Sequence, residues 1–482
     1  MKKDKSGCGC EAFGKCGACQ TLNLDYEEEL SLKMKREITL LKRFGHIEEI
    51  LPSPGGEEGK RPLGYRNKAQ YLFRYNGGRI NMGLYRSSDG GLTRVDRCPM
   101  EAPELASVAR TVRKLIEPWG LKVWDGRRGT LRHVMIRKGF ATGEVLCALV
   151  TKGGLFEKAQ EFADELAARH PELKSISVIA NDTDTPLFMN GEEYVLRGPG
   201  TIEDELCGCR FRISAKAFYQ VNPGATELLY RKAAEFAEIG PDSRVLDAYC
   251  GIGTVGIVAA KGRCGSLEGF DVSEDAVRDA EKNAEKNGIG NAVYSARKDG
   301  GFGADGEKRY DVILADPPRA GCDRRFLGTM LRAQPERLVY ISCNPETLAR
   351  DLEVLRDRYR VKAIQPVDLF PGTYHVETVC LLSKLESQSH IEVKLNMSEL
   401  DLTKAEKKAT YQEIKDYVME HTGLKVSSLY IAQVKEKCGI IERENYNKAK
   451  SENPKKLTCP PEKEKAIRDA FVHFGMIAEG TS

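Results

Sequence analysis

A glycine-rich turn between an apolar run and a helix-like stretch constrains this chain more than any other feature. The run "RVL" leads into "DAYCGIGTVGIVAA", residues 247–260, where glycines stand at positions 251, 253 and 256. Glycine has no Cβ, so the backbone can turn tightly and approach a ligand closely. Such a turn at the carboxyl end of the first strand of a parallel sheet forms a cofactor crevice. The stretch therefore predicts an open α/β domain that binds a cofactor.

The residues that follow repeat an alternation of short strands and helices. "SLEGFDV", "DVILADP", "RLVYISC" and "TVCLLSKL" are apolar runs separated by helix-like stretches, a pattern typical of a parallel sheet covered on both faces. Asp271 ends the second strand, about twenty residues after the glycines, where a carboxylate can accept hydrogen bonds from ribose hydroxyls. A dinucleotide cofactor fits this spacing as well. The later sequence shows no set of residues typical of hydride transfer, however, and instead contains a candidate nucleophilic thiol and a carboxylate.

Four regions differ in composition, and we predict one domain for each. Residues 1–50 hold a cysteine-rich segment and a helix, residues 51–212 are dominated by strands, residues 213–385 form the Rossmann-like domain, and residues 386–482 are rich in Lys and Glu and helical. The expected fold class is α/β, with a mainly β central domain and a small helical C-terminal module. No catalytic motif stands out in that module.

Composition limits the compartment and the kind of cysteine chemistry. No stretch of eighteen uncharged apolar residues occurs, and the start "MKKDKSGCGC" has no apolar signal region. We therefore expect a cytoplasmic protein with no membrane partner. Fifteen cysteines in such a chain favour metal-binding or catalytic thiols over disulfides. The net charge of +3 neither requires nor excludes nucleic acid as a partner.

Cys343 stands where an apolar run ends, in "LVYISCNPETLARDL", residues 338–352. The following Asn and Pro suit a turn, because Pro cannot continue a strand ladder. Loops at strand ends are where α/β enzymes keep reactive groups. The alternative is a boundary cysteine without a role, since many thiols are inert.

Four stretches resemble the motifs of a known enzyme family. "DAYCGIGTVG", "ADPPRAGCD", "SCNPETLARDL" and "DLFPGTYHVETVCLL", in this order and spacing, are similar to those of the S-adenosylmethionine-dependent RNA uridine C5-methyltransferases. The resemblance runs from about Cys8 to Leu385. It is closest to the bacterial members that modify 23S rRNA, because a cysteine set of the iron–sulfur type is present. The same reaction on tRNA is the alternative.

The resemblance implies the following roles. The thiolate of Cys343 adds to C6 of uracil, which lets C5 take the methyl group of S-adenosylmethionine. Glu377 then removes the C5 proton, and His375 is the rival base. The positions that match the family's cofactor contacts are Gln220, Tyr249, Gly251, Thr254, Asp271 and Asp316.

A cysteine cluster near the N-terminus suggests a metal centre. Cys10, Cys16 and Cys19 follow a C-x5-C-x2-C spacing, Cys98 is a possible fourth ligand, and Cys8 is a possible substitute. Four thiolates suit either a [4Fe–4S] cluster or a structural zinc ion, and the spacing alone leaves the two nearly even. The resemblance favours the iron–sulfur cluster. The remaining alternative is a set of idle thiols.

Cations and rings interleave in the strand-dominated region, as single-stranded RNA recognition requires. The candidates are Arg66, Lys68, Arg74, Arg79, Arg86, Arg94, Arg97, Arg132, Arg137 and Lys138, with Tyr65, Tyr71, Phe73, Tyr75 and Tyr85. A solvated charged face over core aromatics would look the same. We expect RNA, 23S rRNA first, as the partner, with no obligate protein partner, and we interpret residues 386–482 as an accessory RNA- or ribosome-binding domain.

Two other functions compete. A cytosine C5-methyltransferase would place its cysteine after the fourth strand, where this chain has "ADPPR". A non-catalytic iron–sulfur RNA-binding protein would not need Cys343 and Glu377 beside a complete cofactor fold.

Overall fold

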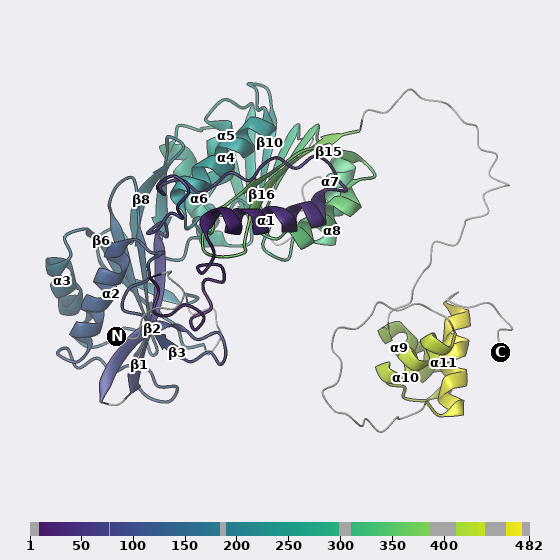
Figure 1. Ribbon diagram of the computed structural model, residues 1–482, viewed down its shortest axis with the longest axis horizontal. Helices are drawn as coiled ribbons and strands as arrows, with labels where there is room; N and C mark the ends of the chain where they lie inside the picture. The colour runs from purple at the N-terminus through teal and green to yellow at the C-terminus, as the bar shows by residue number, and fades with distance from the viewer. Residues whose placement is uncertain are drawn as a thin grey trace. The chain divides into compact units, whose positions relative to one another are not determined.

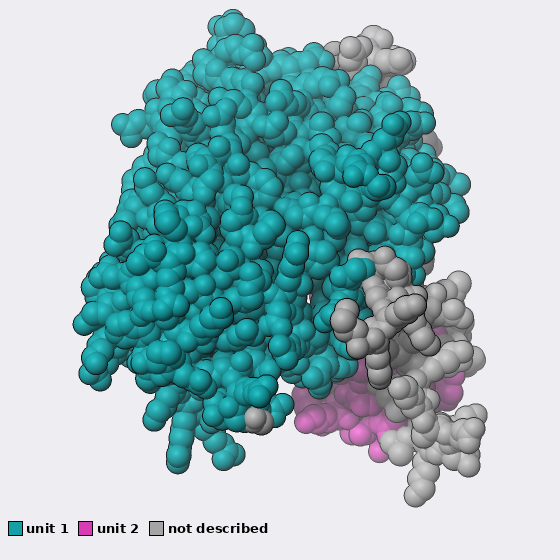
Figure 2. Space-filling model, turned by 60° about the vertical axis from the view of Figure 1, so that its left-hand side comes forward, with its two compact units in different colours: residues 1–387 teal, residues 388–482 magenta. Residues whose placement is uncertain are grey.

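The computed structural model describes residues 9–76, 78–183, 189–297, 310–385, 411–438 and 459–474. The chain divides into two compact units, residues 1–387 and 388–482 (Figure 2). In the part of the chain that the structure describes, no helix is long and apolar enough to cross a membrane. The finer division at residues 50 and 212 stays a prediction.

A seven-stranded sheet forms the second half of the first unit, with strand order β12-β11-β10-β13-β14-β16-β15. Strands β10 to β14 pair in parallel, whereas β16 is antiparallel to both of its neighbours. The strands are β10 (Arg244–Ala248), β11 (Ser266–Asp271), β12 (Ala292–Ala296), β13 (Val312–Ala315), β14 (Arg337–Ser342), β15 (Tyr359–Val367) and β16 (Glu377–Lys384). The prediction of an α/β domain with a largely parallel sheet is confirmed.

Helices cover both faces of this sheet (Figure 1). Neighbouring strand residues point to opposite faces, so Val245 packs in the core with α4, α5 and α6, while Leu246 packs in the core with α1, α7 and α8. The helices are α1 (Tyr26–Leu41), α4 (Pro223–Ala237), α5 (Thr254–Ala260), α6 (Glu274–Lys286), α7 (Arg324–Ala333) and α8 (Pro345–Leu355). Helix α1 is thus part of the α/β layer structure, although 202 residues (42–243) separate it in sequence from β10.

A second seven-stranded sheet, of order β3-β2-β1-β4-β5-β6-β7, forms the first half of the unit. Its strands are β1 (Lys68–Asn76), β2 (Arg79–Tyr85), β3 (Leu92–Arg94), β4 (Leu131–Lys138), β5 (Val145–Thr151), β6 (Leu173–Ala180) and β7 (Glu192–Arg197). Helices α2 (Pro103–Ile116) and α3 (Ala159–Arg169) cover one face. Met135 and Leu146 on the other face join the core of the α/β sheet. A ribbon of β8 (Thr201–Leu206) and β9 (Cys209–Ser214) leads into α4.

The second unit contains three helices in its described residues, α9 (Tyr411–Thr422), α10 (Ser428–Lys437) and α11 (Pro461–His473). Ile414, Val418, Ile431 and Phe471 are fully buried among them. These helices confirm the expected helical module.

A buried charge network fixes α1 against the α/β sheet. Lys33 is fully buried and donates to Glu29 at 2.7 Å, to Asp368 at 2.6 Å and to the carbonyl of Phe370 at 3.2 Å. The Tyr26 hydroxyl also donates to Asp368, at 2.8 Å. Each buried charge is therefore paired, which removes the large desolvation cost of an isolated ion. The network holds the segment after β15 to α1.

Replacing Lys33 by Met should destabilise the first unit by about 3–5 kcal/mol, because Glu29 and Asp368 would lose their shared buried cation. Urea denaturation followed by far-ultraviolet circular dichroism measures this change. Lys35→Met on the exposed side of α1 is the matched control, with an expected change within about 0.5 kcal/mol. Equal stabilities for the two variants would contradict the role assigned to the network.

Candidate active site and cysteine-rich segment

The glycine turn after β10 forms as the sequence predicts, and one glycine is required by close packing. Gly256 donates its N–H to Asp247 Oδ2 at 3.0 Å, and a Cβ at this position would lie 2.6 Å from the same oxygen. Gly253 has φ +81°, a conformation that favours glycine, at the residue before α5. The turn therefore places the start of α5 at the carboxyl ends of the strands.

The predicted cofactor residues gather around this turn. Asp271 at the end of β11 accepts hydrogen bonds from the N–H groups of Gly251 at 3.0 Å and Ser273 at 2.9 Å. Thr254 is hydrogen-bonded to the Tyr230 hydroxyl at 3.1 Å. Tyr249 packs edge-on against Phe326, Asp316 directly follows β13, and Gln220 is buried shortly before α4. Their roles as cofactor contacts stay predictions.

Two carboxyl groups, that of half-buried Asp316 and that of buried Glu377, lie near each other where β13 ends and β16 begins. Burial raises the pKa of Asp316 to about 7. Burial, followed by the nearby charge of Asp316, raises the pKa of Glu377 well above its usual value, and Arg319 opposes this shift. A carboxylate in such a place holds a proton more strongly than an exposed one. Glu377 is thus suited to accept a proton from carbon.

Cys343 follows β14 directly and is half-buried in the turn before α8. Asn344 begins the helix, because its side chain accepts from the N–H of Glu346 at 3.2 Å. Burial and the nearby charges of Glu377 and Asp316 raise the pKa of the Cys343 thiol to about 11, and Arg319 opposes this rise through its charge and a hydrogen bond. The thiol therefore lies beside the two carboxyl groups, as the motif order implies.

Arg319 is a site residue to which the sequence reasoning gave no role. Its Nη2 lies 3.2 Å from Nε2 of His375, and its backbone carbonyl accepts from Asn344 Nδ2 at 3.2 Å. It is a cation that contacts the thiol and also influences Glu377. The signal was present in the sequence, since the arginine directly follows the two prolines after Asp316.

His375 is poorly suited to be the base. Burial and the charge of Arg319 lower its pKa to about 4, so the imidazole stays neutral and binds a proton weakly at neutral pH. This favours Glu377 over His375 as proton acceptor, although the assignment of the base stays a prediction.

The cysteine-rich segment packs against the strand-rich part of the unit. Cys10, Cys19 and Cys98 contact the small core formed by Leu22, Tyr65 and Met100. Burial raises the pKa of the Cys19 thiol to about 12, and nearby Cys16 and Cys10 raise it as well. Among the described residues, no group of three or more His, Cys, Asp or Glu side chains is already arranged to hold a metal ion. Cys8 lies outside the described residues.

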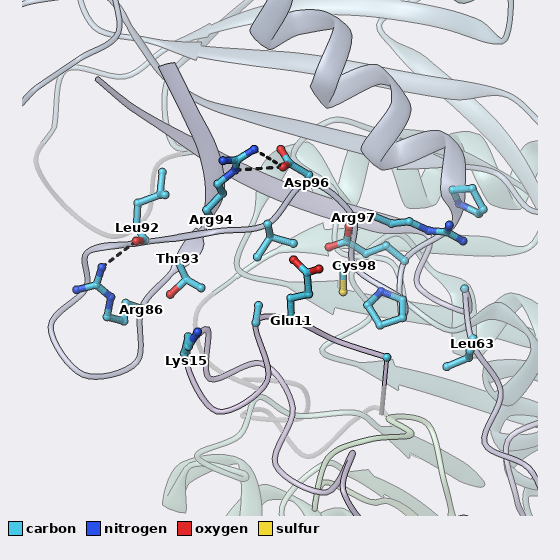
Figure 3. Close-up of a pocket in the computed structure, with 17 residues that line it drawn as sticks. Glu11, Lys15, Leu63, Arg86, Leu92, Thr93, Arg94, Asp96, Arg97 and Cys98 are labelled. Atoms are coloured by element: carbon cyan, nitrogen blue, oxygen red, sulfur yellow. Dashed lines mark hydrogen bonds and ion pairs between the residues drawn. The ribbon is translucent and has the colours of Figure 1, made fainter. Parts of the chain in front are cut away.

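Cys98 also lines a cavity of about 1200 Å³ between residues 9–15 and strand β3 (Figure 3). Lys15, Arg86, Arg94 and Arg97 surround it, and Arg94 is paired with Asp96 at 2.8 Å. The cavity is therefore bordered by cations that face solvent.

The cysteine-rich segment contacts the loop that leads to Glu377. The N–H groups of Gln20 and Thr21 donate to the carbonyl of Gly372 at 3.0 and 3.1 Å. The Tyr65 hydroxyl donates to the carbonyl of Pro371 at 2.9 Å. The position of this loop thus depends on the segment that contains Cys16 and Cys19.

Several predicted RNA contacts are wrong, because the side chains are buried in the fold. Arg137 is 1% exposed and donates to the carbonyl of Ala217 at 2.7 Å. Arg132 donates to the carbonyl of Asn181 at 2.9 Å. The aromatic side chains of Tyr65, Tyr71 and Phe73 are core residues, whereas Tyr75 and Tyr85 are exposed. Arg79, Arg86, Arg94 and Arg97 are exposed as well.

Replacing Arg319 by Met should raise the pKa of Cys343 and lower its thiolate fraction at about pH 8, because a nearby cation stabilises the thiolate. Each unit of pKa change lowers the alkylation rate about tenfold in this range. The measurement is timed iodoacetamide labelling, with the Cys343 peptide quantified by mass spectrometry over a pH series. Arg324→Met, an exposed arginine at the start of α7, should leave the rate unchanged.

Two family models match the α/β part of the chain. The model described as tRNA (Uracil-5-)-methyltransferase matches residues 306–385, and the model described as methyltransferase small domain matches residues 220–338. The first match contains Asp316, Cys343 and Glu377.

Whole-length relatives and a solved structure extend this similarity. A protein of Halalkalibacterium halodurans named an uncharacterized RNA methyltransferase is 38% identical over 394 residues, which cover 79% of this chain and 84% of the relative. A protein of Bacillus cereus with the same description is 36% identical over 78% of this chain and 83% of the relative. The crystal structure of Pyrococcus abyssi tRNA (uracil-54, C5)-methyltransferase in complex with S-adenosyl-L-homocysteine is 28% identical, has a TM-score of 0.63, and covers 76% of this chain and 86% of its own. This chain therefore belongs to the RNA methyltransferase family that carries the tRNA (uracil-5-)-methyltransferase domain.

Proposed function

We propose that this protein transfers the methyl group of S-adenosylmethionine to C5 of a uridine in RNA, with 23S rRNA as the substrate. The observation that carries the proposal is the placement of Cys343 beside Arg319, Asp316 and Glu377 at the carboxyl ends of β13 and β14. The description of the matching family model supports uracil as the base. The ligand of the Pyrococcus abyssi structure supports S-adenosylmethionine as the donor.

The chemistry requires a nucleophile and a base, and the site has candidates for both. The Cys343 thiolate attacks C6 of uracil, and the electron pair of the C5–C6 double bond moves to the enolate. S-adenosylmethionine supplies an electrophilic methyl group. C5 takes this group, the bond between the methyl carbon and the sulfonium breaks, and S-adenosyl-L-homocysteine leaves with the electron pair. Glu377 removes the C5 proton, the double bond re-forms, and the bond between Sγ and C6 breaks.

Arg319 has two tasks in this scheme. Its positive charge favours the thiolate before attack, since it lowers the pKa of Cys343. Its Nη2 also contacts Nε2 of His375, which holds the guanidinium near the Cys343 thiol. We therefore add Arg319 to Cys343 and Glu377 as an active-site residue of the proposed reaction.

Replacing Glu377 by Gln should trap the reaction after methyl transfer, because no group would then remove the C5 proton. We expect an adduct of protein and RNA that survives denaturing electrophoresis, together with loss of turnover. The Cys343→Ala variant should form neither adduct nor product. An adduct that still forms in Cys343→Ala would contradict the assignment of the nucleophile.

The substrate is tested with the purified full chain, S-adenosylmethionine, and separate 23S rRNA and tRNA transcripts. Mass spectrometry of the digested RNA measures 5-methyluridine. 5-Methyluridine in 23S rRNA would support the proposal. 5-Methyluridine in tRNA alone would support the proposed reaction but would make tRNA the substrate. Methylation of cytosine or of neither RNA would contradict the proposed function.

We further propose that Cys10, Cys16, Cys19 and Cys98 hold a [4Fe–4S] cluster, with zinc as the alternative. The support is the donor chemistry, since four thiols lie in one half-buried region, and thiolates are the ligands of both centres. Such a centre would stabilise the segment that holds the loop before Glu377 through Gly372. No step of the methyl transfer requires it.

Anaerobically purified protein should contain iron and sulfide, and the Cys98→Ser variant should lose them, because one of four ligands is removed. Elemental analysis and the visible absorption spectrum measure this content. Cys264→Ser, at a buried cysteine of the α/β part, is the control and should keep the metal. Zinc in place of iron would correct the identity of the metal, and metal content that is unchanged in Cys98→Ser would remove Cys98 from the ligand set.

A further inference from the structure

A cationic loop of residues 122–131 lies at the end of the β1–β7 sheet that faces away from the α/β sheet; we call it the arginine loop. Strand β4 begins at its last residue, Leu131, and runs for eight residues toward the α/β part. Near the far end of the strand, Arg137 donates to the carbonyl of Ala217. At about 3.3 Å per residue, the loop lies roughly 20–25 Å from that contact. It belongs to neither the active site nor the cysteine-rich segment.

The backbone of the arginine loop is held in one conformation. The carboxylate of Asp125 accepts from the N–H groups of Arg127 at 2.8 Å and Arg128 at 2.7 Å, and the N–H of Asp125 donates to the carbonyl of Arg128 at 3.0 Å. Gly129 has φ +103°, and a Cβ there would lie 2.2 Å from the carbonyl oxygen of Val123. The two arginines are thus presented on a fixed turn.

Both arginine side chains point to solvent. Arg127 and Arg128 are exposed, and neither guanidinium forms an ion pair or a side-chain hydrogen bond with another of the described residues. The one acid within the loop, Asp125, uses its carboxylate to accept from the loop's own N–H groups. The positive charge is therefore left for an external anion.

A cavity of about 510 Å³ next to the loop adds further cations and rings. Its lining includes Trp119, Lys122, Lys152, Phe156 and Lys158. Lys122 and Lys158 are exposed, and the ammonium of Lys152 lies 5.5 Å from the ring centroid of Trp124 in the loop. Both tryptophans of the chain are thus at this end of the sheet.

We propose that the arginine loop, with its Lys122, and the adjoining Lys158 bind the phosphate backbone of the RNA substrate, away from the reacting uridine. Arginine presents a planar fork that matches phosphate oxygens, and nearby rings give unpaired bases a surface for stacking. This inference rests on the proposed function for the identity of the RNA, and it concerns binding only. The loop lies at the opposite end of β4 from the contact of Arg137 with Ala217. It would therefore contact an element of the RNA that flanks the reacting uridine.

The first test is the salt dependence of RNA binding by the full chain. Arg127→Gln combined with Arg128→Gln removes two charges from the loop, and Arg360→Gln combined with Lys362→Gln removes two exposed charges from edge strand β15 as the control. Binding to a 23S rRNA transcript is measured by filter retention over a salt series. The loop variant should bind more weakly, and its slope of log affinity against log salt should be shallower by about 1–2. The control should match wild type.

The second test uses the two tryptophans as reporters. Addition of the same transcript should change the tryptophan fluorescence of wild type and of Trp119→Phe, because Trp124 remains in the loop. The change should be smaller in Trp124→Phe, in which only Trp119 of the adjoining cavity remains. An unchanged response in Trp124→Phe would contradict a contact at the loop. Circular dichroism confirms that each variant is folded, so a smaller signal is not loss of structure.

The outcomes separate this inference from the proposed function. If the protein forms 5-methyluridine while the loop and control variants bind RNA equally, the loop inference is wrong and the function stands. If loop-dependent RNA binding occurs without 5-methyluridine, the loop inference stands and the function is wrong. Binding that depends on the loop only for intact ribosomal subunits would assign the surface to a protein partner and overturn the RNA contact.

Discussion

The buried ion pairs of Lys33 join the N-terminal helix to the segment that precedes Glu377. Lys33 contacts Glu29 and Asp368 with no exposure to solvent, and Arg61 bonds to the second oxygen of Glu29 at 2.9 Å. Removal of Lys33 would leave Asp368 without its buried cation and Glu29 with Arg61 as its remaining cation. The loop of residues 368–376 is therefore positioned by side chains more than 300 residues earlier in the sequence.

The same contacts connect α1, the cysteine-rich segment and the loop that precedes Glu377. Glu29 accepts from the N–H of Gly372 at 2.8 Å, and the carbonyl of the same residue accepts from the cysteine-rich segment. A side chain at Gly372 would meet Leu22 at 2.9 Å. The chain from α1 through this loop to Glu377 is thus closely packed, which suits the role proposed for Glu377 as the base beside Cys343.

The electrostatics of the active site follow from the same burial. Low solvent access raises the pKa of Asp316, Glu377 and Cys343 together, and one guanidinium, that of Arg319, opposes the shift for Glu377 and Cys343. Two carboxyl groups, one thiol and one cation therefore influence one another's protonation. The arrangement suits a reaction in which a thiol must lose a proton and a carboxylate must gain one.

The sequence by itself determined the α/β class, the glycine turn, and the positions of Asp271, Asp316 and Cys343 at strand ends, because local periodicity and turn chemistry depend on neighbouring residues. Only the tertiary structure decided which charges are buried. The inward face of α1 contains Glu29, Lys33 and Glu37, a pattern that in sequence looks like a solvated surface with an i,i+4 pair. The sequence likewise did not predict the burial of Arg137 or the exposure of the arginine loop. Alternation along a strand does not tell which face of the strand meets another domain. Long-range packing sets solvent access, and solvent access decides whether a charge stabilises the fold or is left to bind a partner.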